Sequence, residues 1–493
     1  MSCRVFRSWL FLTRWSWIST LSVNVGLRFL KKFPFSGFQG SHVLISYLTA
    51  FFLIIPAAQA EIFDDVTETR LENGLTVILM ENHIAPVVTF QVWYHAGSRK
   101  DTWGNTGLAH VFEHMMFKGT KEHSGEEFTR LIQSQGGNFN AFTSYDFAGY
   151  FENMMADRID IAMKLEADRM QNLVLRAEEF QTEVKVVMEE RRMRVEDNPQ
   201  AYLSEQTQAI AFQAQPYHWP IIGWMDDLKR LTIEDMRRHY DLYYRPINAF
   251  IVVVGDFQTD RMAAKIRKWF GDIPSKEQPP LIKYHDPPQR GERRVEVHAY
   301  AELPYIMIGY HVPNLKNPDD AYVLEVIAAI LSAGKSSLLY QNLVLEKQLA
   351  LSATAHNALL SVDPDLFAIA AEPLPEVTPE HLEDALTSQL EKLKTEPVPE
   401  RQLQKAKNQL ETAFIYSQDS AFYQGMLLAR YEIASRWQDI RKYVPAIRMV
   451  TAEEIQRVAR KYFVKENRTV GILYPKEREQ KEDSGATDTE EGK

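Results

Sequence analysis

The sequence TIEDMRRHYDLYYRPINAFIVVV occupies residues 232–254, and TAEEIQRVARKYFVKENRTVGIL occupies residues 451–473, at an offset of 219 residues without a gap. Each segment begins with Thr, followed three residues later by an acid, which is typical of a helix N-terminus. Each then predicts a helix, an aromatic turn at Tyr243 or Tyr462, and a short apolar strand. The chain is therefore expected to contain two similar units in tandem.

The beginnings of the two units correspond more loosely. An apolar stretch starts at Pro86 in the first unit, and a similar one starts at Pro304 in the second. Asn73-Gly74 between two apolar runs predicts a hairpin, and helices are expected at 107–118, 157–172 and 178–196. We therefore predict an α+β fold: two homologous α/β domains, each with a mostly antiparallel sheet packed by helices.

Proline and polar clusters suggest the domain boundaries. Pro279-Pro280 and Pro287-Pro288 indicate a linker, and the C-terminus is polar and free of large apolar residues. The predicted organisation is a leader at 1–60, a first domain at 61–275, a linker at 276–291, a second domain at 292–475 and a disordered polar tail at 476–493.

The leader differs in composition from the rest of the chain. Residues 1–60 contain no Asp or Glu and six basic residues, and the apolar run 43–55 is followed by Pro56-Ala-Ala-Gln-Ala60. This pattern predicts a secretory signal that is cleaved after about Ala60, and hence a periplasmic protein. An uncleaved membrane anchor and a mitochondrial presequence are the alternatives.

Charge and cysteine content exclude several classes of protein. The net charge is −10, and it becomes −16 without residues 1–60, so a nucleic-acid-binding role is not expected. The single Cys rules out an internal disulfide framework and a zinc site built from cysteines. Gly334-Lys335-Ser336 resembles the end of a phosphate loop, but position 329 is Ala where the loop requires Gly, so no nucleotide site is expected.

The sequence GLAHVFEHMMFKGT at residues 107–120 carries the strongest chemical signal. His110 and His114 are four residues apart, so on a helix both imidazoles can reach one metal ion. Glu113 lies beside that face and can take a proton from a metal-bound water without being a ligand itself. The H-x-x-E-H order is the inverted zincin motif. The alternative is a helix with two polar histidines and no metal.

A third ligand is expected on the helix predicted at 178–196. Glu183 and Glu190 are seven residues apart and share a face, so one can bind the metal and the other can orient a ligand. Glu189 points about 100° away, and we expect it to face solvent or form an ion pair. An ordinary charged helix face is the alternative.

Together these motifs resemble the pitrilysin/insulinase family of zinc metallopeptidases, and most closely its mitochondrial-processing-peptidase branch. The resemblance covers nearly all of residues 65–475. It implies one Zn²⁺ per chain held by His110, His114 and Glu190, with Glu113 as general base and Glu183 at the second acidic position. Within GGNFNAFT (136–143), it also implies that Asn140 and Ala141 form part of an edge strand beside the substrate backbone.

The second unit departs from the family pattern. Its corresponding helix, 322–331, contains no His, and Leu338 and Leu351 stand where the family has Arg and Tyr. Leucine cannot stabilise a developing oxyanion. The resemblance therefore implies a heterodimer with a homologous subunit that supplies Arg and Tyr, or a homodimer; other residues of this chain could also substitute for them.

The sequence thus predicts a zinc endopeptidase that cleaves unfolded peptides or small polypeptides. The alternative is a non-catalytic subunit with a structural, assembly or peptide-binding role in a processing-peptidase-like complex.

Overall fold

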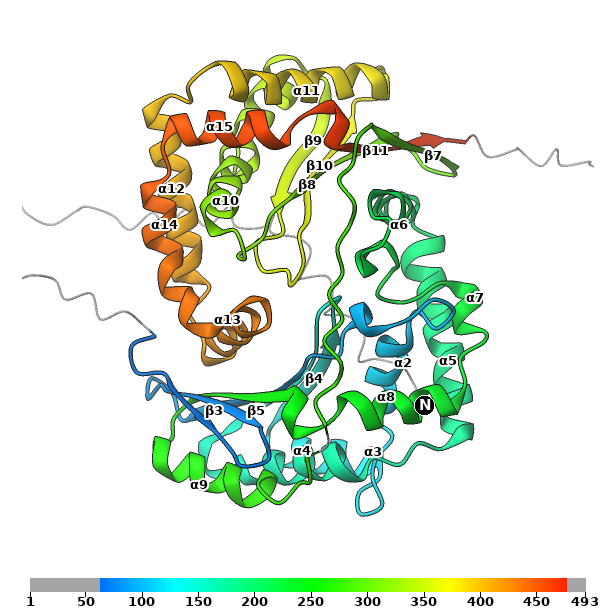
Figure 1. The fold of residues 1–493 in the computed structure, drawn as a ribbon, viewed down its shortest axis with the longest axis vertical. Coiled ribbons are helices and arrows are strands. Elements are labelled where there is room, and N and C mark those ends of the chain that lie inside the picture. The colour runs from blue at the N-terminus through cyan, green and yellow to red at the C-terminus, as the bar shows by residue number, and fades with distance from the viewer. Residues whose placement is uncertain (1–62, 276, 477–493) are drawn as a thin grey trace, which may run out of the picture. The chain divides into compact units, whose positions relative to one another are not determined.

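The computed structural model describes residues 63–275 and 277–476 (Figure 1). It contains two sheets. The first has six strands in the order β1-β2-β6-β3-β5-β4, and the second has five in the order β7-β11-β8-β10-β9. Helices pack on both sheets, so the predicted α+β fold is confirmed. The predicted leader, residues 1–60, and the predicted tail beyond residue 476 lie outside the described residues.

The two sheets have the same internal connectivity. β2 is parallel to β6, and β7 is parallel to β11, whereas all other neighbouring strands are antiparallel. β6 and β11 are the apolar strands of the repeat quoted above, so the predicted tandem duplication is confirmed. β1 is an additional edge strand of the first sheet. The strands are β1 (Thr67–Arg70), β2 (Thr76–Glu81), β3 (Val87–Tyr94), β4 (Asn138–Thr143), β5 (Ala148–Met155), β6 (Ala249–Gly255), β7 (Arg293–Ala299), β8 (Tyr305–Val312), β9 (Ala350–Asn357), β10 (Asp365–Pro373) and β11 (Arg468–Pro475).

The α-helices are distributed over both halves. They are α2 (Leu108–Met115), α3 (Gly125–Ser134), α4 (Asp160–Asn172), α5 (Ala177–Arg191), α6 (Pro199–Ala211), α7 (Met225–Leu228), α8 (Ile233–Tyr243), α9 (Thr259–Phe270), α10 (Pro318–Ser332), α11 (Pro379–Thr395), α12 (Glu400–Tyr416), α13 (Ala421–Ala434), α14 (Tyr443–Met449) and α15 (Ala452–Tyr462). None of the described helices is both long and apolar enough to span a membrane.

Local sequence signals explain where several elements begin. The repeated helices α8 and α15 start with full capping boxes, Thr232 with Asp235 and Thr451 with Glu454. The β1–β2 hairpin forms around Asn73-Gly74. Gly74 adopts a φ of +89°, and the Asn73 side chain donates to the Phe270 carbonyl at 2.7 Å. The predicted helix starts at Thr232 and Thr451 and the predicted hairpin at Asn73-Gly74 are thus confirmed.

The central strands β2, β3 and β6 of the first sheet are almost completely buried on both faces, which explains their continuous apolar sequences. In β6, Ile251 and Val253 pack with the helices of the first half, whereas Phe250, Val252 and Val254 join the core of the second half. The halves also exchange helices. The first-half helix α6 packs on β7, β8 and β11, and the second-half helix α13 packs on β3 and β6.

The connection between the halves is tied to the first half. The described residues 277–291 form no helix or strand. Asp286 accepts hydrogen bonds from the backbone N–H groups of residues 213–215 at 2.7–3.0 Å. The Tyr284 ring lies 5.1 Å from the Arg99 guanidinium. The segment predicted to be a linker is thus held by specific polar contacts.

Candidate metal centre

The N-terminus of α2 is fixed by a buried aspartate. Asp101 accepts hydrogen bonds from the backbone N–H groups of Gly107 and Ala109 at 2.9 and 3.1 Å. Gly107 has a φ of +84°, and a Cβ there would lie 2.6 Å from the Ile222 carbonyl oxygen, so only glycine fits. Burial raises the pKa of the Asp101 carboxyl well above its usual range. This cap holds the first turn of α2 in place.

His110 and His114 lie on the same side of α2, as predicted. Their ring centroids are 5.1 Å apart. Helix α5 packs against α2 and brings two carboxylates to His114. The Nδ1 atom of His114 lies 3.1 Å from Glu183 Oε2, and its Nε2 atom lies 3.5 Å from Glu190 Oε2. Each ring nitrogen of His114 therefore faces one of the two predicted glutamates.

His110, His114 and Glu190 form a group suited to a metal ion. One ligand atom from each lies within 4.8 Å of the others, and within residues 63–275 and 277–476 no second His/Cys/Asp/Glu group meets that criterion. The Nδ1 atom of His110 is buried and has no hydrogen-bond partner among the described residues. Two imidazoles and one carboxylate form a donor set typical of catalytic zinc sites, which leave one position open. The residues present therefore fit a zinc ion.

The electrostatics of the group favour a positive charge between the carboxylates. Burial would lower the pKa of His114, but the contacts with Glu183 and Glu190 outweigh burial and raise it to about 9. Burial would raise the pKa of Glu190, yet His114, His110 and Arg194 lower it to about 2. Burial lowers the pKa of His110 to about 4, so its ring stays neutral and can donate a lone pair.

Glu113 lies next to the ligand group but is not part of it. Burial raises the pKa of its carboxyl, and the Thr143 hydroxyl and His114 oppose that shift. Thr143 belongs to β4, so Glu113 lies where α2 approaches this strand. A carboxylate in this position can exchange protons with a reactant at the metal without binding the metal itself.

The acidic residues of α5 are placed as their spacing predicts. Glu183 also forms an ion pair with Lys118, which lies three residues beyond the end of α2. Glu190 is nearly buried, whereas the Glu189 side chain is 59% exposed and pairs with Arg192 at 2.6 Å. Glu183 thus orients His114, and Glu189 forms a surface ion pair.

Asn140 and Ala141 lie on β4, which is an edge strand of the first sheet. They are not in the ligand group. The Asn140 side-chain oxygen accepts a hydrogen bond from the Ala141 N–H at 2.9 Å. The side chain thus pairs with a backbone donor of its own strand. The position at a sheet edge is confirmed; the contact with a peptide backbone stays a prediction.

The second half contributes packing rather than ligands at the corresponding positions. α10 is almost completely buried, and Leu338 packs against the core of that half. Leu351 lies on the edge strand β9 and is 47% exposed. Neither leucine side chain can donate a hydrogen bond.

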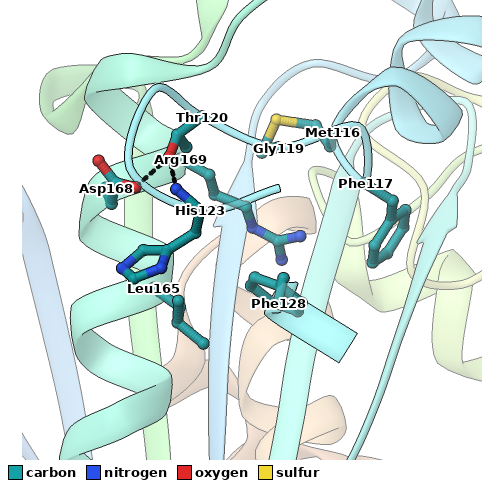
Figure 2. A pocket seen from close by; sticks show the side chains of 9 residues that line it. All are labelled: Met116, Phe117, Gly119, Thr120, His123, Phe128, Leu165, Asp168 and Arg169. Atoms are coloured by element: carbon teal, nitrogen blue, oxygen red, sulfur yellow. Dashed lines mark hydrogen bonds between the residues drawn. The ribbon is translucent and has the colours of Figure 1, made fainter. Parts of the chain in front are cut away.

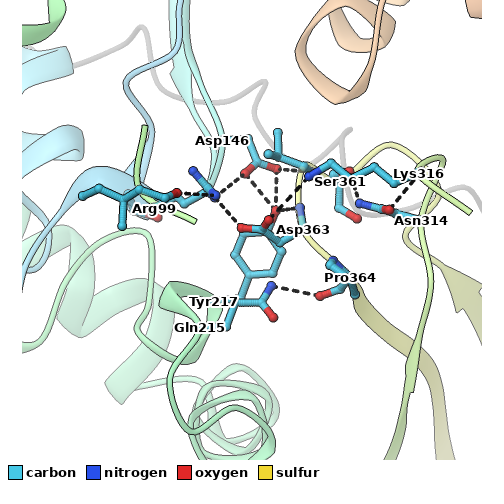
Figure 3. Close-up of polar contacts among 12 residues, drawn as sticks. Arg99, Asp146, Gln215, Tyr217, Asn314, Lys316, Ser361, Asp363 and Pro364 are labelled. Atoms are coloured by element: carbon cyan, nitrogen blue, oxygen red, sulfur yellow. Dashed lines mark hydrogen bonds and ion pairs between the residues drawn. The ribbon is translucent and has the colours of Figure 1, made fainter. Parts of the chain in front are cut away.

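A polar cluster that was not predicted from the sequence joins the two halves (Figure 3). Arg99 Nε donates to Asp363 Oδ2 at 2.6 Å and lies 3.9 Å from Asp146. The Tyr217 hydroxyl donates to Asp146 at 2.8 Å and accepts from the Asp363 N–H at 3.2 Å. These residues come from four segments that are far apart in the sequence, so no local spacing could have revealed the cluster.

A small cavity lies beside the loop that follows α2 (Figure 2). Its volume is about 10 Å³, and His123, Asp168 and Arg169 are among the residues that line it. Such a volume holds about one water molecule, so the cavity cannot accommodate a peptide. Thr120 hydrogen-bonds with Asp168 there and ties this loop to α4.

Comparison with known proteins agrees with this geometry. The insulinase (peptidase family M16) model matches residues 76–223, and the peptidase M16 inactive domain model matches residues 230–410. The first match contains the ligand group, and the second contains Leu338 and Leu351.

Relatives of known name cover most of the chain. A zinc protease, PqqE, from Helicobacter pylori is 34% identical over 410 residues, which are 82% of this chain and 92% of the relative. The crystal structure of a protease from the same species has a TM-score of 0.80 at 32% identity, covering 83% of this chain and 99% of that one. A putative M16-like peptidase from Alicyclobacillus acidocaldarius shares the fold, with a TM-score of 0.73 at 19% identity and coverage of 83% and 98%. With the inverted motif, the duplicated sheet and this degree of identity, the chain belongs to the insulinase family, peptidase family M16.

Proposed function

We propose that this protein is a zinc-dependent endopeptidase that hydrolyses unfolded peptides or small polypeptides. The observation that carries the proposal is the convergence of His110, His114 and Glu190 within 4.8 Å. The contact of Glu183 with His114 supports it, because such partners orient metal-binding imidazoles.

Hydrolysis requires a group that holds the metal and a group that transfers the proton, and different residues of the chain have these two roles. A zinc ion held by His110, His114 and Glu190 would polarise water and the scissile carbonyl. Glu113 takes a proton from the attacking water as the new C–O bond forms. It then gives that proton to the amide nitrogen as the C–N bond breaks, so the carboxylate is regenerated. The buried setting of Glu113 suits it to hold a proton between these two steps.

The sheet edge at β4 supports peptides as the substrate class. An extended peptide can add to an exposed edge through main-chain hydrogen bonds, largely independent of its sequence. Asn140 and Ala141 would then contact the peptide backbone, and the Asn140 side chain would have to release the Ala141 N–H that it now satisfies.

We further propose that a second, homologous chain completes the site with the Arg and Tyr that Leu338 and Leu351 replace. The alternatives are that two copies of this chain form an active homodimer or that the single chain is active by itself. We also propose that the protein works in the periplasm after loss of residues 1–60, on the composition of that leader.

The test is digestion of a mixed peptide pool by residues 61–493 with one zinc per chain, read by mass spectrometry. Cleavage that a chelator abolishes and added zinc restores is the expected result if the chain or its homodimer is complete. A zinc-loaded chain that cleaves only after addition of a homologous subunit would support the heterodimer. A chain that binds no zinc, or that cleaves nothing under either condition, would favour the non-catalytic alternative.

A further inference from the structure

A π-helix follows the predicted metal ligand on α5. η3 (Arg192–Glu196) continues α5, and the Asp197 N–H donates to the Arg192 carbonyl five residues earlier at 2.8 Å. π-helices are rare, and they occur frequently at functional sites. This one lies within two residues of Glu190.

The π-helix presents Arg194 to the ligand group. Arg194 Nη1 lies 2.7 Å from Glu190 Oε1, whereas the other carboxylate oxygen of Glu190 faces His114. The positive charge of Arg194 also acts on His110 and Glu113 and lowers the pKa of each. Its side chain is 51% exposed. A guanidinium has five N–H donors, and contact with Glu190 through Nη1 leaves others free.

The neighbouring basic residues are engaged elsewhere. Lys118 pairs with Glu183, Arg192 pairs with Glu189, and Arg191 is buried between Glu205 and the Gly223 carbonyl. Of these four basic residues, Arg194 contacts a predicted ligand and remains half exposed.

We propose that Arg194 contacts the substrate and donates a hydrogen bond to the scissile carbonyl oxygen. As water adds to the carbonyl carbon, the C=O electron pair moves to that oxygen, and the guanidinium stabilises the charge without giving up a proton. The pair returns to the carbonyl when the C–N bond breaks. Arg194 would thereby supply from the first half one of the roles that Leu338 and Leu351 leave open. This inference rests on the proposed peptidase function.

A purely positioning role is the competing explanation. If Arg194 acts only by holding Glu190, its loss weakens zinc binding and lowers activity in proportion. If it contacts the substrate, its loss lowers kcat with zinc still bound, and it weakens binding of a tetrahedral mimic more than binding of the parent peptide.

The test uses the zinc-loaded chain in the form that cleaves peptides, with Arg194→Met, Arg194→Lys and Arg192→Met. Arg192 is the matched control, because it is 48% exposed and pairs with Glu189. Arg194→Met is expected to lower kcat about 10²-fold, as loss of one oxyanion donor does, with zinc affinity changed less than about threefold. Arg192→Met should leave kcat unchanged. Arg194→Lys, which keeps the charge, should retain more activity than Arg194→Met.

A second measurement separates the two proposals. In a Glu113→Gln background, the affinity of a phosphinic peptide is compared with that of the parent peptide. The preference for the phosphinic peptide should fall at least tenfold with Arg194→Met. An unchanged preference, a kcat equal to that of Arg192→Met, or a zinc affinity that falls in step with kcat would each overturn the role of Arg194. If the protein with native Arg194 neither cleaves nor prefers the phosphinic peptide, the peptidase proposal itself fails.

Discussion

The two halves share one sheet topology but differ in one helix, which is α2 in the first half and α10 in the second. In the first half, the eight-residue α2 carries His110, Glu113 and His114 beside α5. In the second half, the fifteen-residue α10 is lined with Val, Ile, Leu and Ala side chains that are almost all buried. The difference shows that the repeat specifies the architecture, whereas a few polar residues on one helix pair specify the chemistry.

The largest effect is expected at Glu113. Glu113→Gln removes the group that accepts and returns the proton but keeps nearly the same shape, so peptide cleavage should fall about 10²–10⁴-fold with zinc content unchanged. Kinetics on a fluorogenic peptide, with zinc measured on the same sample, provide the readout. Glu189→Gln on α5 is the control and should retain full activity, because Glu189 is exposed and pairs with Arg192 at the surface. Cleavage that survives in Glu113→Gln would remove Glu113 from the mechanism.

The next effect concerns Glu190 and its neighbour in sequence. Glu190→Ala should weaken zinc binding more than about 100-fold, because loss of an outer-shell partner alone costs 10–100-fold. Glu189→Ala should leave zinc binding as it is. Competition with a chromophoric chelator measures both variants. Equal zinc affinity in the two would assign the third ligand to another residue, and Glu183 would be the first candidate.

The stabilising role of the second half can be tested separately from the metal. Ile327 of α10 is fully buried, so Ile327→Ala should cost about 2–5 kcal/mol of unfolding free energy. Zinc stoichiometry below the unfolding transition should stay at one per chain. Met449→Ala, at a position 76% exposed, is the control and should change stability little. Loss of zinc from folded Ile327→Ala would show that the halves do not divide their roles in this way.

The sequence predicted the features that depend on neighbours along the chain. The capping boxes at Thr232 and Thr451, the hairpin at Asn73-Gly74 and the shared face of His110 and His114 follow from spacings of a few residues. The Glu183–Glu190 pair was found in the same way. Contacts between distant loops were not predicted, because nothing local in Arg99, Asp146 or Asp363 indicates their partners. The exchange of α6 and α13 between the halves was missed for the same reason.

Arg194 was only partly predictable, because its contact with Glu190 follows from local spacing but its role does not. It lies four residues after Glu190, a spacing that predicts side-chain contact on a helix. In the sequence it belongs to a cluster of three arginines, Arg191, Arg192 and Arg194, which is typical of a solvated surface. Only the structure distinguishes the arginine that faces the ligand group from those that do not.

The smallest effect is expected at the junction of the halves. Asp146 is buried there beside Arg99, Asp363 and Tyr217, and it accepts a hydrogen bond from the Val362 N–H at 3.1 Å. Burial, with a contribution from Asp363, raises the pKa of Asp146 to about 6 from an ordinary value of 3.8, although Tyr217, Val362 and Arg99 oppose the shift. The folded protein therefore binds this proton more tightly than the unfolded chain. This group's contribution to the free energy of unfolding falls as pH rises from about 4 to 6.

Asp146→Asn removes that titration while keeping an acceptor for Tyr217 and Val362. The melting temperature of Asp146→Asn minus that of the unsubstituted protein should therefore be higher at pH 8 than at pH 5, by a few degrees. Thermal unfolding at both pH values measures this difference, with Asp157→Asn as control because the Asp157 side chain is 75% exposed. The control should show no such change with pH. A difference that is equal at pH 5 and pH 8 would mean that Asp146 is already ionised through its contact with Arg99. The junction would then act as a permanent ion pair, and the two halves would be joined equally well across this pH range.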